Sequence, residues 1–232
     1  MWYYYFDPLY FTLMLPVFII AIGAQIMVKS RYKKYSHVAN TAGMTGEKMA
    51  RYILDSNGLY NVRVQLVSGE MSDHYNPKTQ TVSLSEGVFN STSVSAIGIA
   101  AHECGHAVQH AEGYFPIKIR TAIIPVCNFG STLSIPLMII GALMNNVYLI
   151  YAGLILFSLI SVFQFVTLPV EFNASRRAMN TIKESNYFYE TDIKGARAVL
   201  TAAAMTYVAA FAQSLAQLLY YFIRFTGGRR ND

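Results

Sequence analysis

A long stretch without any charged residue is the feature that most limits how this chain can fold. Residues 121–170 contain no Asp, Glu, Lys or Arg, and shorter uncharged runs cover Leu9–Val28 and Ala198–Ile223. A membrane-spanning helix needs about 20 consecutive apolar residues, so the longest run is long enough for two spans. Asn145 and Asn146 near its middle predict a tight turn. We therefore expect a mainly α membrane protein with about four transmembrane helices, at residues 9–28, 121–143, 148–169 and 198–223.

The composition agrees with that expectation. Hydrophobic residues make up 53% of the 232 residues and charged residues only 13%, whereas soluble domains average about 25% charged residues. The net charge of +5 comes mostly from basic residues beside the apolar runs, where such residues orient helices and attract the lipid surface. Aromatic and basic residues do not interleave, so we expect the lipid bilayer as a partner and no nucleic acid.

The distribution of Lys and Arg predicts the orientation in the cell membrane. The first eight residues contain neither, and a basic cluster of Lys29, Arg31, Lys33 and Lys34 follows the first apolar run. A signal peptide has the reverse order, so this run is expected to be an uncleaved anchor with the aromatic residues 2–6 at the interface. The positive-inside rule then places the basic cluster in the cytoplasm of a multi-pass protein.

These assignments divide the chain into five segments. We expect an N-terminal anchor (1–28), a cytoplasmic α+β portion (29–118), a transmembrane hairpin (119–169), a cytoplasmic helix (170–197) and a C-terminal apolar helix with a basic tail (198–232). If the last helix crosses, Arg224, Arg229 and Arg230 lie outside, against the positive-inside rule. Whether this helix spans fully, re-enters or lies along the interface is left open.

The segment His102–His106 is an H-E-x-x-H motif within an apolar run. On a helix, His102 and His106 share one face a turn apart and can bind one metal ion, while Glu103 can act as general base on a metal-bound water. Burying these three polar side chains without partners would be costly. The alternative is two ordinary core histidines with Glu103 at a solvated edge.

A catalytic zinc usually has three protein ligands, so a third must lie elsewhere. His110 is a poor choice, because one straight helix cannot wrap three consecutive turns around an ion; His74 is a further candidate. We expect Glu171 to be the ligand, since two spans between it and His106 return the chain to the same side. The alternative is a carboxylate that merely favours a helix N-terminus, where Pro169 suggests that a helix breaks or begins.

The cytoplasmic α+β portion supplies candidates for substrate contacts. Thr45 is expected to cap a helix over 46–56, and residues 62–67 alternate like a strand. A second alternating strand precedes the motif, and we weigh two roles for it equally: an exposed edge that binds an extended substrate, or an ordinary hairpin strand. Its residues are Thr79, Gln80, Thr81, Val82, Ser83 and Leu84.

Four side chains are candidates for stabilising an oxyanion or contacting substrate. They are His74, Tyr75, Arg176 and Arg177. The sequence does not rank them, and arginines at a membrane edge are more often cytoplasmic anchors.

The chain resembles the YugP-type neutral zinc metallopeptidases of bacterial membranes over nearly its whole length. The similarity lies in residues 102–109 (HECGHAVQ), 170–178 (VEFNASRRA) and 73–77 (DHYNP) leading into 81–85 (TVSLS). A more distant likeness is to the HtpX and Ste24 membrane peptidases, which place a transmembrane hairpin between the motif and a glutamate ligand. Their Glu-x-x-Ala-Asp pattern has an Asp that supports a zinc histidine, where this chain has Ser175. Asn173 or Ser175 is then expected to share that supporting role.

Together these features predict a membrane-embedded, gluzincin-like zinc endopeptidase with one Zn²⁺ per chain and its active site at the cytoplasmic face. Its substrates would be membrane or membrane-proximal proteins; the sequence gives no oligomeric state. The first alternative is a zinc-binding scaffold without turnover, for which Glu103 would have no use. The second is a channel or transporter, which would need ionisable residues inside the spans.

Overall fold

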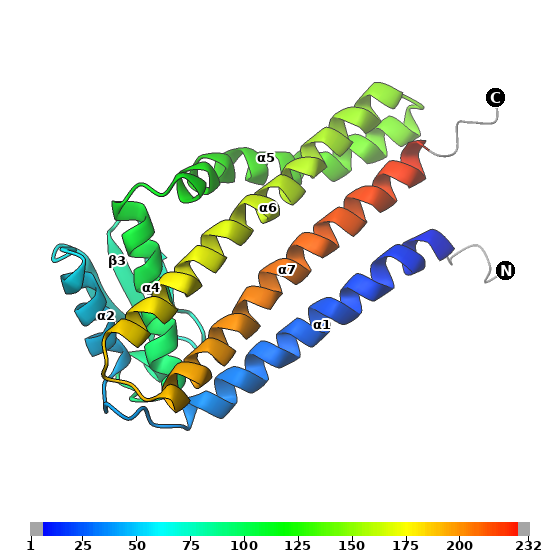
Figure 1. Ribbon diagram of the computed structural model, residues 1–232. Helices are drawn as coiled ribbons and strands as arrows, with labels where there is room; N and C mark the ends of the chain where they lie inside the picture. Colours follow the sequence, from blue (N-terminus) through cyan, green and yellow to red (C-terminus); the bar gives the residue numbers. More distant parts are fainter. Residues whose placement is uncertain (1–6, 227–232) are drawn as a thin grey trace. The chain divides into compact units, whose positions relative to one another are not determined.

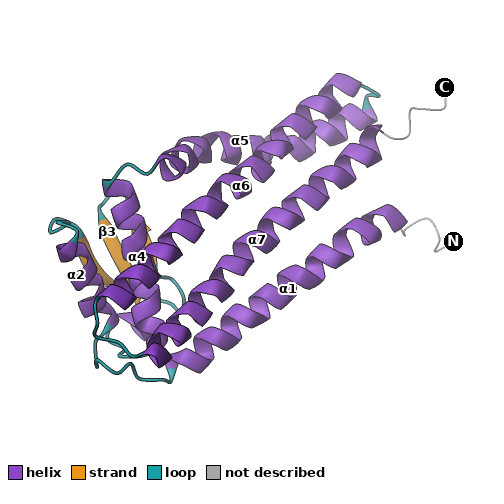
Figure 2. Ribbon diagram, viewed as in Figure 1, coloured by secondary structure: helices purple, strands orange, loops and turns teal. Residues whose placement is uncertain are grey.

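A computed structural model describes residues 7–226, and its elements are shown in Figures 1 and 2. The aromatic residues 2–6 and the basic pair Arg229 and Arg230, which entered the topology prediction, lie outside the described residues. The elements are α1 (Pro8–Ser36), α2 (Gly46–Ser56), β1 (Arg63–Val67), β2 (His74–Asn76), β3 (Thr81–Ser85), α3 (Glu86–Phe89), α4 (Val94–Ala111), α5 (Phe115–Leu143), α6 (Val147–Glu184) and α7 (Glu190–Thr226).

The chain forms two compact units, which are described separately. The first, the apolar unit, comprises residues 1–24, 119–168 and 206–232. The second, the sheet unit, comprises residues 25–118 and 169–205. The helices α1, α6 and α7 each contribute one part to the apolar unit and the other part to the sheet unit.

The four apolar runs form four helices, as predicted. Helices α1, α5, α6 and α7 are each long and apolar enough to cross a membrane. Their apolar parts expose large hydrophobic side chains, including Ile19, Phe129 and Ile155, which is the arrangement expected of a surface that faces lipid. The predicted turn also forms: α5 ends at Leu143, and Asn145 adopts a left-handed conformation with φ of 52° before α6 begins.

The end of α7 lies beside the start of α1 within the apolar unit. The rings of Tyr10 and Tyr220 are 5.1 Å apart at their centroids. The Tyr220 hydroxyl donates to an Asp7 carboxylate oxygen at 2.9 Å, and the same oxygen lies 3.8 Å from Arg224. Asp7 therefore places a negative charge beside Arg224, one of the three arginines that fitted the positive-inside rule poorly.

One predicted helix boundary is wrong. Pro169 was expected to break the chain or begin a new helix, but α6 continues through it to Glu184. The predicted cytoplasmic helix over 170–197 is instead the last part of α6, a short loop and the first turns of α7. Proline removes one backbone donor and bends a helix, but long apolar helices tolerate it, and Pro16, Pro125 and Pro136 also lie inside helices here.

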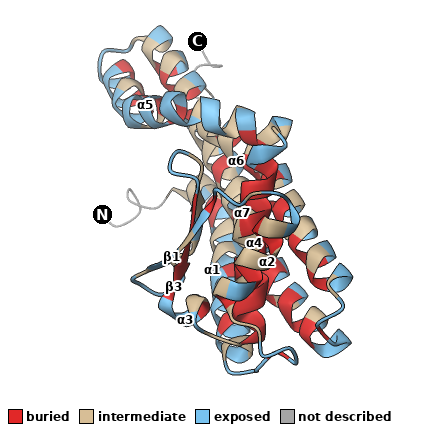
Figure 3. Cartoon of the chain, turned by 90° about the vertical axis from the view of Figure 1, so that its left-hand side faces the viewer, coloured by how far each residue is buried: buried red, intermediate tan, exposed pale blue. Residues whose placement is uncertain are grey.

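A three-stranded sheet lies in the sheet unit, in the order β1-β3-β2. β1 pairs with β3 in parallel and β2 pairs with β3 antiparallel. The helix predicted over 46–56 is α2, and the Thr45 side chain accepts a hydrogen bond from the Lys48 amide as its N-cap. Helix α4 packs against α2 and the sheet, and most of it is buried (Figure 3).

The prediction of a substrate-binding edge strand over 79–84 is wrong. Thr79 and Gln80 belong to the turn before the strand, and β3 (Thr81–Ser85) is the central strand with a neighbour on each side. All five of its residues are buried. Alternation within one segment does not reveal how many neighbours a strand has, and the short strand β2 was not anticipated as the partner that covers this edge.

Glycines on α4 allow other helices to approach it closely. A methyl group on Gly105 would come within 2.9 Å of the Ala174 carbonyl oxygen on α6, and one on Gly98 within 3.3 Å of the Ala196 side chain on α7. The glycine inside the H-E-x-x-H motif therefore lets α4 lie against the backbone of α6. That contact brings the motif next to the segment of α6 that carries Glu171.

Candidate metal centre

Helix α4 presents the two motif histidines side by side. Ser93 caps the helix by accepting a hydrogen bond from the Ala96 amide, and the helix continues through the motif to Ala111. The rings of His102 and His106 are 4.8 Å apart at their centroids and nearly perpendicular. Because the two histidines are one helical turn apart, as the spacing predicted, their Nε2 atoms lie close enough together to face one ion.

Glu171 on α6 completes a three-residue cluster. Its Oε2 atom lies 3.2 Å from His102 Nε2 and 3.5 Å from His106 Nε2. One ligand atom from each of the three residues lies within 4.8 Å of the others. Ligands about 2.1 Å from a tetrahedral zinc ion are about 3.4 Å from one another, so the two Glu171 distances fit this ion.

Burial and charge both make the cluster suited to a cation. His106 is 9% exposed and Glu171 only 2%. Burial by itself raises the pKa of Glu171, but the hydrogen bonds and charges of His102 and His106 outweigh it and hold that pKa well below its ordinary value. Burial likewise lowers the pKa of His106, and its contacts with Glu171 outweigh burial and raise it. The carboxylate is therefore ionised and available as a ligand.

A chain of hydrogen bonds fixes the orientation of His106. Arg177 Nε donates to Asn173 Oδ1 at 2.8 Å, and Gln109 Nε2 donates to the same Asn173 oxygen at 2.9 Å and to the Val170 carbonyl at 2.8 Å. Gln109 Oε1 lies 3.0 Å from His106 Nδ1.

The direction of each hydrogen bond in this series follows from Arg177, whose guanidinium can only donate. Asn173 must therefore present its oxygen, and Gln109 must donate with its amide nitrogen. Gln109 then has only its oxygen to offer His106, so His106 Nδ1 must carry the proton. In the neutral imidazole the proton is therefore on Nδ1, and Nε2, which faces Glu171, is the atom left to bind a metal.

His102 is held by a different partner. Its Nδ1 atom lies 3.2 Å from Ser175 Oγ, on the same helix as Glu171. A serine hydroxyl can donate to Nδ1 or accept from it; with a metal on Nε2, Nδ1 would carry the proton and Ser175 would accept that hydrogen bond, without a negative charge of its own. Of the two residues between which the sequence left the supporting role open, Ser175 contacts His102 directly and Asn173 is connected to His106 through Gln109.

Gln109 was not anticipated as part of the site. It is fully buried although it is polar, and it follows His106 by three residues on α4. A polar residue three positions after a ligand lies near that ligand on a helix, and its burial requires partners. The spacing was therefore visible in the sequence, but the partners on α6 were not.

Glu103 is half-buried beside the cluster. Among residues 7–226 it has no hydrogen-bond or ion-pair partner, unlike the three candidate ligands. A carboxylate that no other side chain holds is free to accept a proton from a water in the site.

The four candidates for oxyanion or substrate contacts are placed differently. The Tyr75 hydroxyl lies 3.1 Å from His110 Nδ1, so Tyr75 faces α4. His74 is exposed and bonds the Ser72 carbonyl. Arg177 donates hydrogen bonds to Asn173 and, at 2.7 Å, to Glu112, and these bonds fix its guanidinium group. Arg176 is exposed on α6.

Comparisons with known proteins find a family model and a relative that each cover most of the chain. The sequence model of the family described as "Putative neutral zinc metallopeptidase" matches residues 10–226. The chain is 46% identical over 210 residues to the "Putative membrane protease YugP" of Bacillus subtilis (strain 168), across 90% of this chain and 93% of that protein. No solved structure matches the chain.

Proposed function

Because this chain belongs to the family of neutral zinc metallopeptidases, we propose that it is an endopeptidase that cleaves membrane or membrane-proximal proteins at the cytoplasmic face. The observation that carries the proposal is the cluster of His102, His106 and Glu171, whose spacing fits one zinc ion. The half-buried Glu103 beside this cluster supplies the base that hydrolysis requires.

Each side chain of the site has a distinct role in the proposed reaction. His102, His106 and Glu171 would hold one zinc ion, which would supply Lewis-acid chemistry by making a water more acidic and by polarising the scissile carbonyl. Glu103 accepts the proton that the attacking water loses and later delivers it to the leaving amine. Ser175 and Gln109 hold the two imidazoles in the tautomer that leaves Nε2 for the metal.

Tyr75 is the best-placed candidate for stabilising the developing oxyanion. It is the one of the four candidates whose side chain bonds to α4, the helix that carries the motif. Burial raises the pKa of its phenol, so the hydroxyl remains protonated at neutral pH and can donate a hydrogen bond. Arg177 is already bound to Glu112 and Asn173, so it is the weaker candidate.

The proposed cytoplasmic placement rests on charge. The sheet unit contains the basic cluster at residues 29–34, together with Lys118 and Arg176 at the ends of the two spans that form the hairpin. The positive-inside rule places such residues in the cytoplasm. All three candidate ligands belong to the same unit, so the site would lie on that side and close to the bilayer.

The proposal is tested by cleavage of an unfolded, labelled protein by the zinc-loaded chain in detergent. The wild type should cleave, and Glu103→Gln should lose at least about a hundredfold in rate because its amide cannot accept the proton. Glu86→Gln, an exposed glutamate on α3, serves as the matched control and should cleave like the wild type. If wild type and Glu103→Gln bind zinc equally but neither cleaves this substrate or extracts of the native membrane, the zinc-binding scaffold is the correct function.

A further inference from the structure

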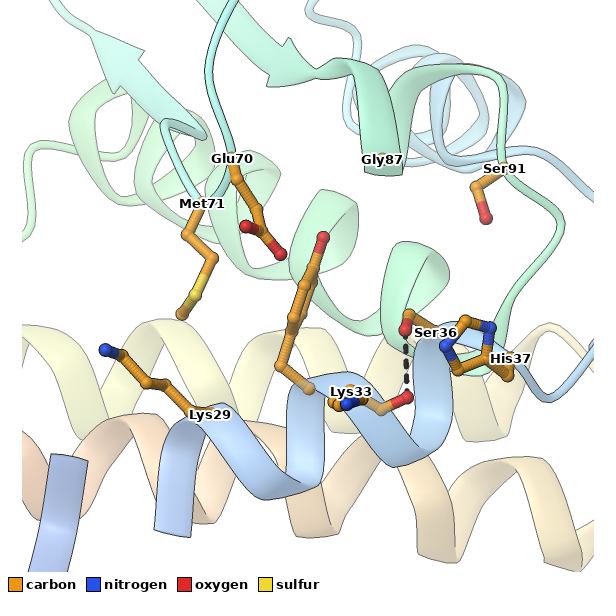
Figure 4. A pocket seen from close by; sticks show the side chains of 9 residues that line it. Lys29, Lys33, Ser36, His37, Glu70, Met71, Gly87 and Ser91 are labelled. Carbon is orange, nitrogen blue, oxygen red and sulfur yellow. Dashed lines mark hydrogen bonds between the residues drawn. The ribbon is translucent and has the colours of Figure 1, made fainter. Parts of the chain in front are cut away.

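A cavity of about 700 Å³ lies in the sheet unit, away from the residues of the metal cluster. One wall is the last part of α1, and the others are the segment after β1 and the region of α3 (Figure 4). Its lining residues are Lys29, Tyr32, Lys33, Ser36, His37, Glu70, Met71, Gly87 and Ser91. The volume is in the range of sites that bind small molecules.

The charged side chains in the cavity lack protein partners. Lys29 and Lys33 lie one turn apart on α1, and Glu70 is on the opposite wall (Figure 4). Within residues 7–226, none of the three side chains has a hydrogen bond or an ion pair. Two cations and one anion therefore border the same space without neutralising one another, which suits a ligand with a negative group and a positive group.

The position of these lysines along α1 points to lipid. Lys29 is the first charged residue after the apolar run Leu9–Val28, and Lys33 follows it on the same continuous helix. At 1.5 Å per residue, Lys33 lies about 7 Å beyond the end of the run. The headgroup layer of each leaflet is roughly 5–8 Å thick, so both ammonium groups would lie at the depth of the lipid phosphates.

We propose that this cavity binds the headgroup of a zwitterionic phospholipid, with the phosphate between Lys29 and Lys33 and a headgroup ammonium beside Glu70. Tyr32 is a further donor in the same wall: its ring is mostly buried, at 7% exposure, and its hydroxyl lies against Gly87. A side chain on residue 87 would come within 2.8 Å of that hydroxyl, so the glycine leaves the space that Tyr32 occupies. The proposal is independent of peptidase activity.

The test measures lipid retained by the purified full-length chain, by native mass spectrometry in detergent with phosphatidylethanolamine, phosphatidylglycerol or phosphatidylcholine added. The wild type should prefer phosphatidylethanolamine, whose primary ammonium can approach Glu70. The double variant Lys29→Gln/Lys33→Gln should bind it roughly tenfold more weakly or worse, because two phosphate contacts are lost. Glu70→Gln should lose the preference for phosphatidylethanolamine over phosphatidylglycerol.

The matched control removes two positive charges from the same helix outside the cavity. Arg31 and Lys34 are exposed and do not line it, so Arg31→Gln/Lys34→Gln should retain lipid within about twofold of the wild type. Equal losses in the two double variants would mean general attraction to anionic surfaces and would overturn the site. Displacement of bound lipid by millimolar inorganic phosphate alone would also overturn it, because the cavity would then be a site for soluble phosphate.

Discussion

At the scale of single residues, Gln109 connects the candidate metal ligand His106 to α6. Its amide nitrogen is bound to the Val170 carbonyl and Asn173, so its oxygen is the only atom left for His106. The sequence pattern predicted roles for four residues of the candidate site. Helical spacing, which is a local property, pointed to the two histidines and Glu103. The number of predicted spans pointed to Glu171. The sequence pattern could not predict which atoms donate and which accept in this series of hydrogen bonds. That direction depends on Arg177 and Asn173 of α6 meeting Gln109 of α4.

We predict that Gln109→Leu lowers the affinity for zinc by about 10- to 100-fold, the usual cost of losing a partner of a metal-binding histidine. The affinity is measured by competition with a chromogenic chelator. Asn173→Asp retains an acceptor for both Gln109 and Arg177 and should stay within a few-fold of the wild type, whereas Asn173→Leu should weaken binding like Gln109→Leu. Similar affinities for Asn173→Asp and Asn173→Leu would show that His106 does not depend on this chain of bonds.

A second prediction concerns Ser175, which contacts the other histidine without a charge. Ser175→Asp places a carboxylate near His102 Nδ1, where it would strengthen the basicity of the imidazole. We expect zinc affinity to rise several-fold in this variant and to fall roughly tenfold in Ser175→Ala. The same chelator competition measures both, and an unchanged affinity in Ser175→Ala would mean that Ser175 does not orient His102.

At the scale of helices and strands, the lengths of the uncharged runs predicted the apolar helices, the capping residue Thr45 predicted α2, and the H-E-x-x-H motif predicted α4, but the strand order was not predicted. Val82 and Leu84 read as one face of a strand, yet nothing local shows that β2 covers the second edge of β3. Pro169 shows the same limit. The residue lies inside α6 because the helix continues into the sheet unit, where Val170 and Ala174 are buried. Burial of Val170 and Ala174 stabilises the part of α6 after Pro169, and this outweighs the tendency of a proline to end a helix.

The contact of α4 with α6 gives an element-scale prediction. Gly105→Ala would place a methyl group 2.9 Å from the Ala174 backbone oxygen, so one helix must move. We expect a loss of about 1–3 kcal/mol in the free energy of unfolding, as in other overpacked sites, with weaker zinc binding because α6 carries Glu171. Gly23→Ala on α1 meets no atom within 4 Å and is the control; it should be neutral or slightly stabilising. Equal stability of the two variants in thermal unfolding would contradict the close packing.

At the scale of the whole molecule, the apolar unit and the sheet unit contribute separately to the proposed function. In that proposal the apolar unit anchors the chain in the bilayer, because its helices are long and apolar enough to cross a membrane and expose large hydrophobic side chains. The sheet unit brings together two histidines from α4 and a glutamate from α6, which lie 65 to 69 residues apart in the sequence. Helix α5 and the apolar part of α6 separate them in the sequence, and the return of α6 to the sheet unit makes the cluster possible.

The proposed orientation is tested by labelling single cysteines in intact cells. Lys48→Cys is exposed on α2 in the sheet unit, whereas the native Cys104 and Cys127 are buried and are replaced by alanine or serine. A membrane-impermeant maleimide should leave Lys48→Cys unlabelled until the cells are opened. Tyr148→Cys, an exposed residue at the start of α6 beyond the hairpin turn, should be labelled in intact cells. The opposite pattern would place the sheet unit outside the cytoplasm.

Removing the metal should change both the stability and its dependence on pH. In the protein from which a chelator has removed the metal, Glu171 has a pKa below its ordinary value of 4.5. Its contribution to stability is therefore fully present above pH 4.5 and is lost as the pH falls through the lowered pKa. His106 has a pKa above its ordinary value of 6.5, so its contribution is present below 6.5 and is lost as the pH rises through the shifted value. Their ion pair therefore stabilises the metal-free fold most at mildly acidic pH, between these two values.

Zinc should have the opposite dependence, because it binds neutral imidazole and competes with protons for His102 and His106. At neutral pH, a free zinc concentration of about 100 times the dissociation constant stabilises the folded protein by about 2.7 kcal/mol. We therefore expect chelation to lower the unfolding temperature strongly at pH 7.5 and little at pH 5.5. Thermal unfolding in detergent with and without zinc measures both, and Glu171→Gln should abolish most of the difference. An equal shift at the two pH values would mean that zinc stabilises the protein through a site other than these two histidines.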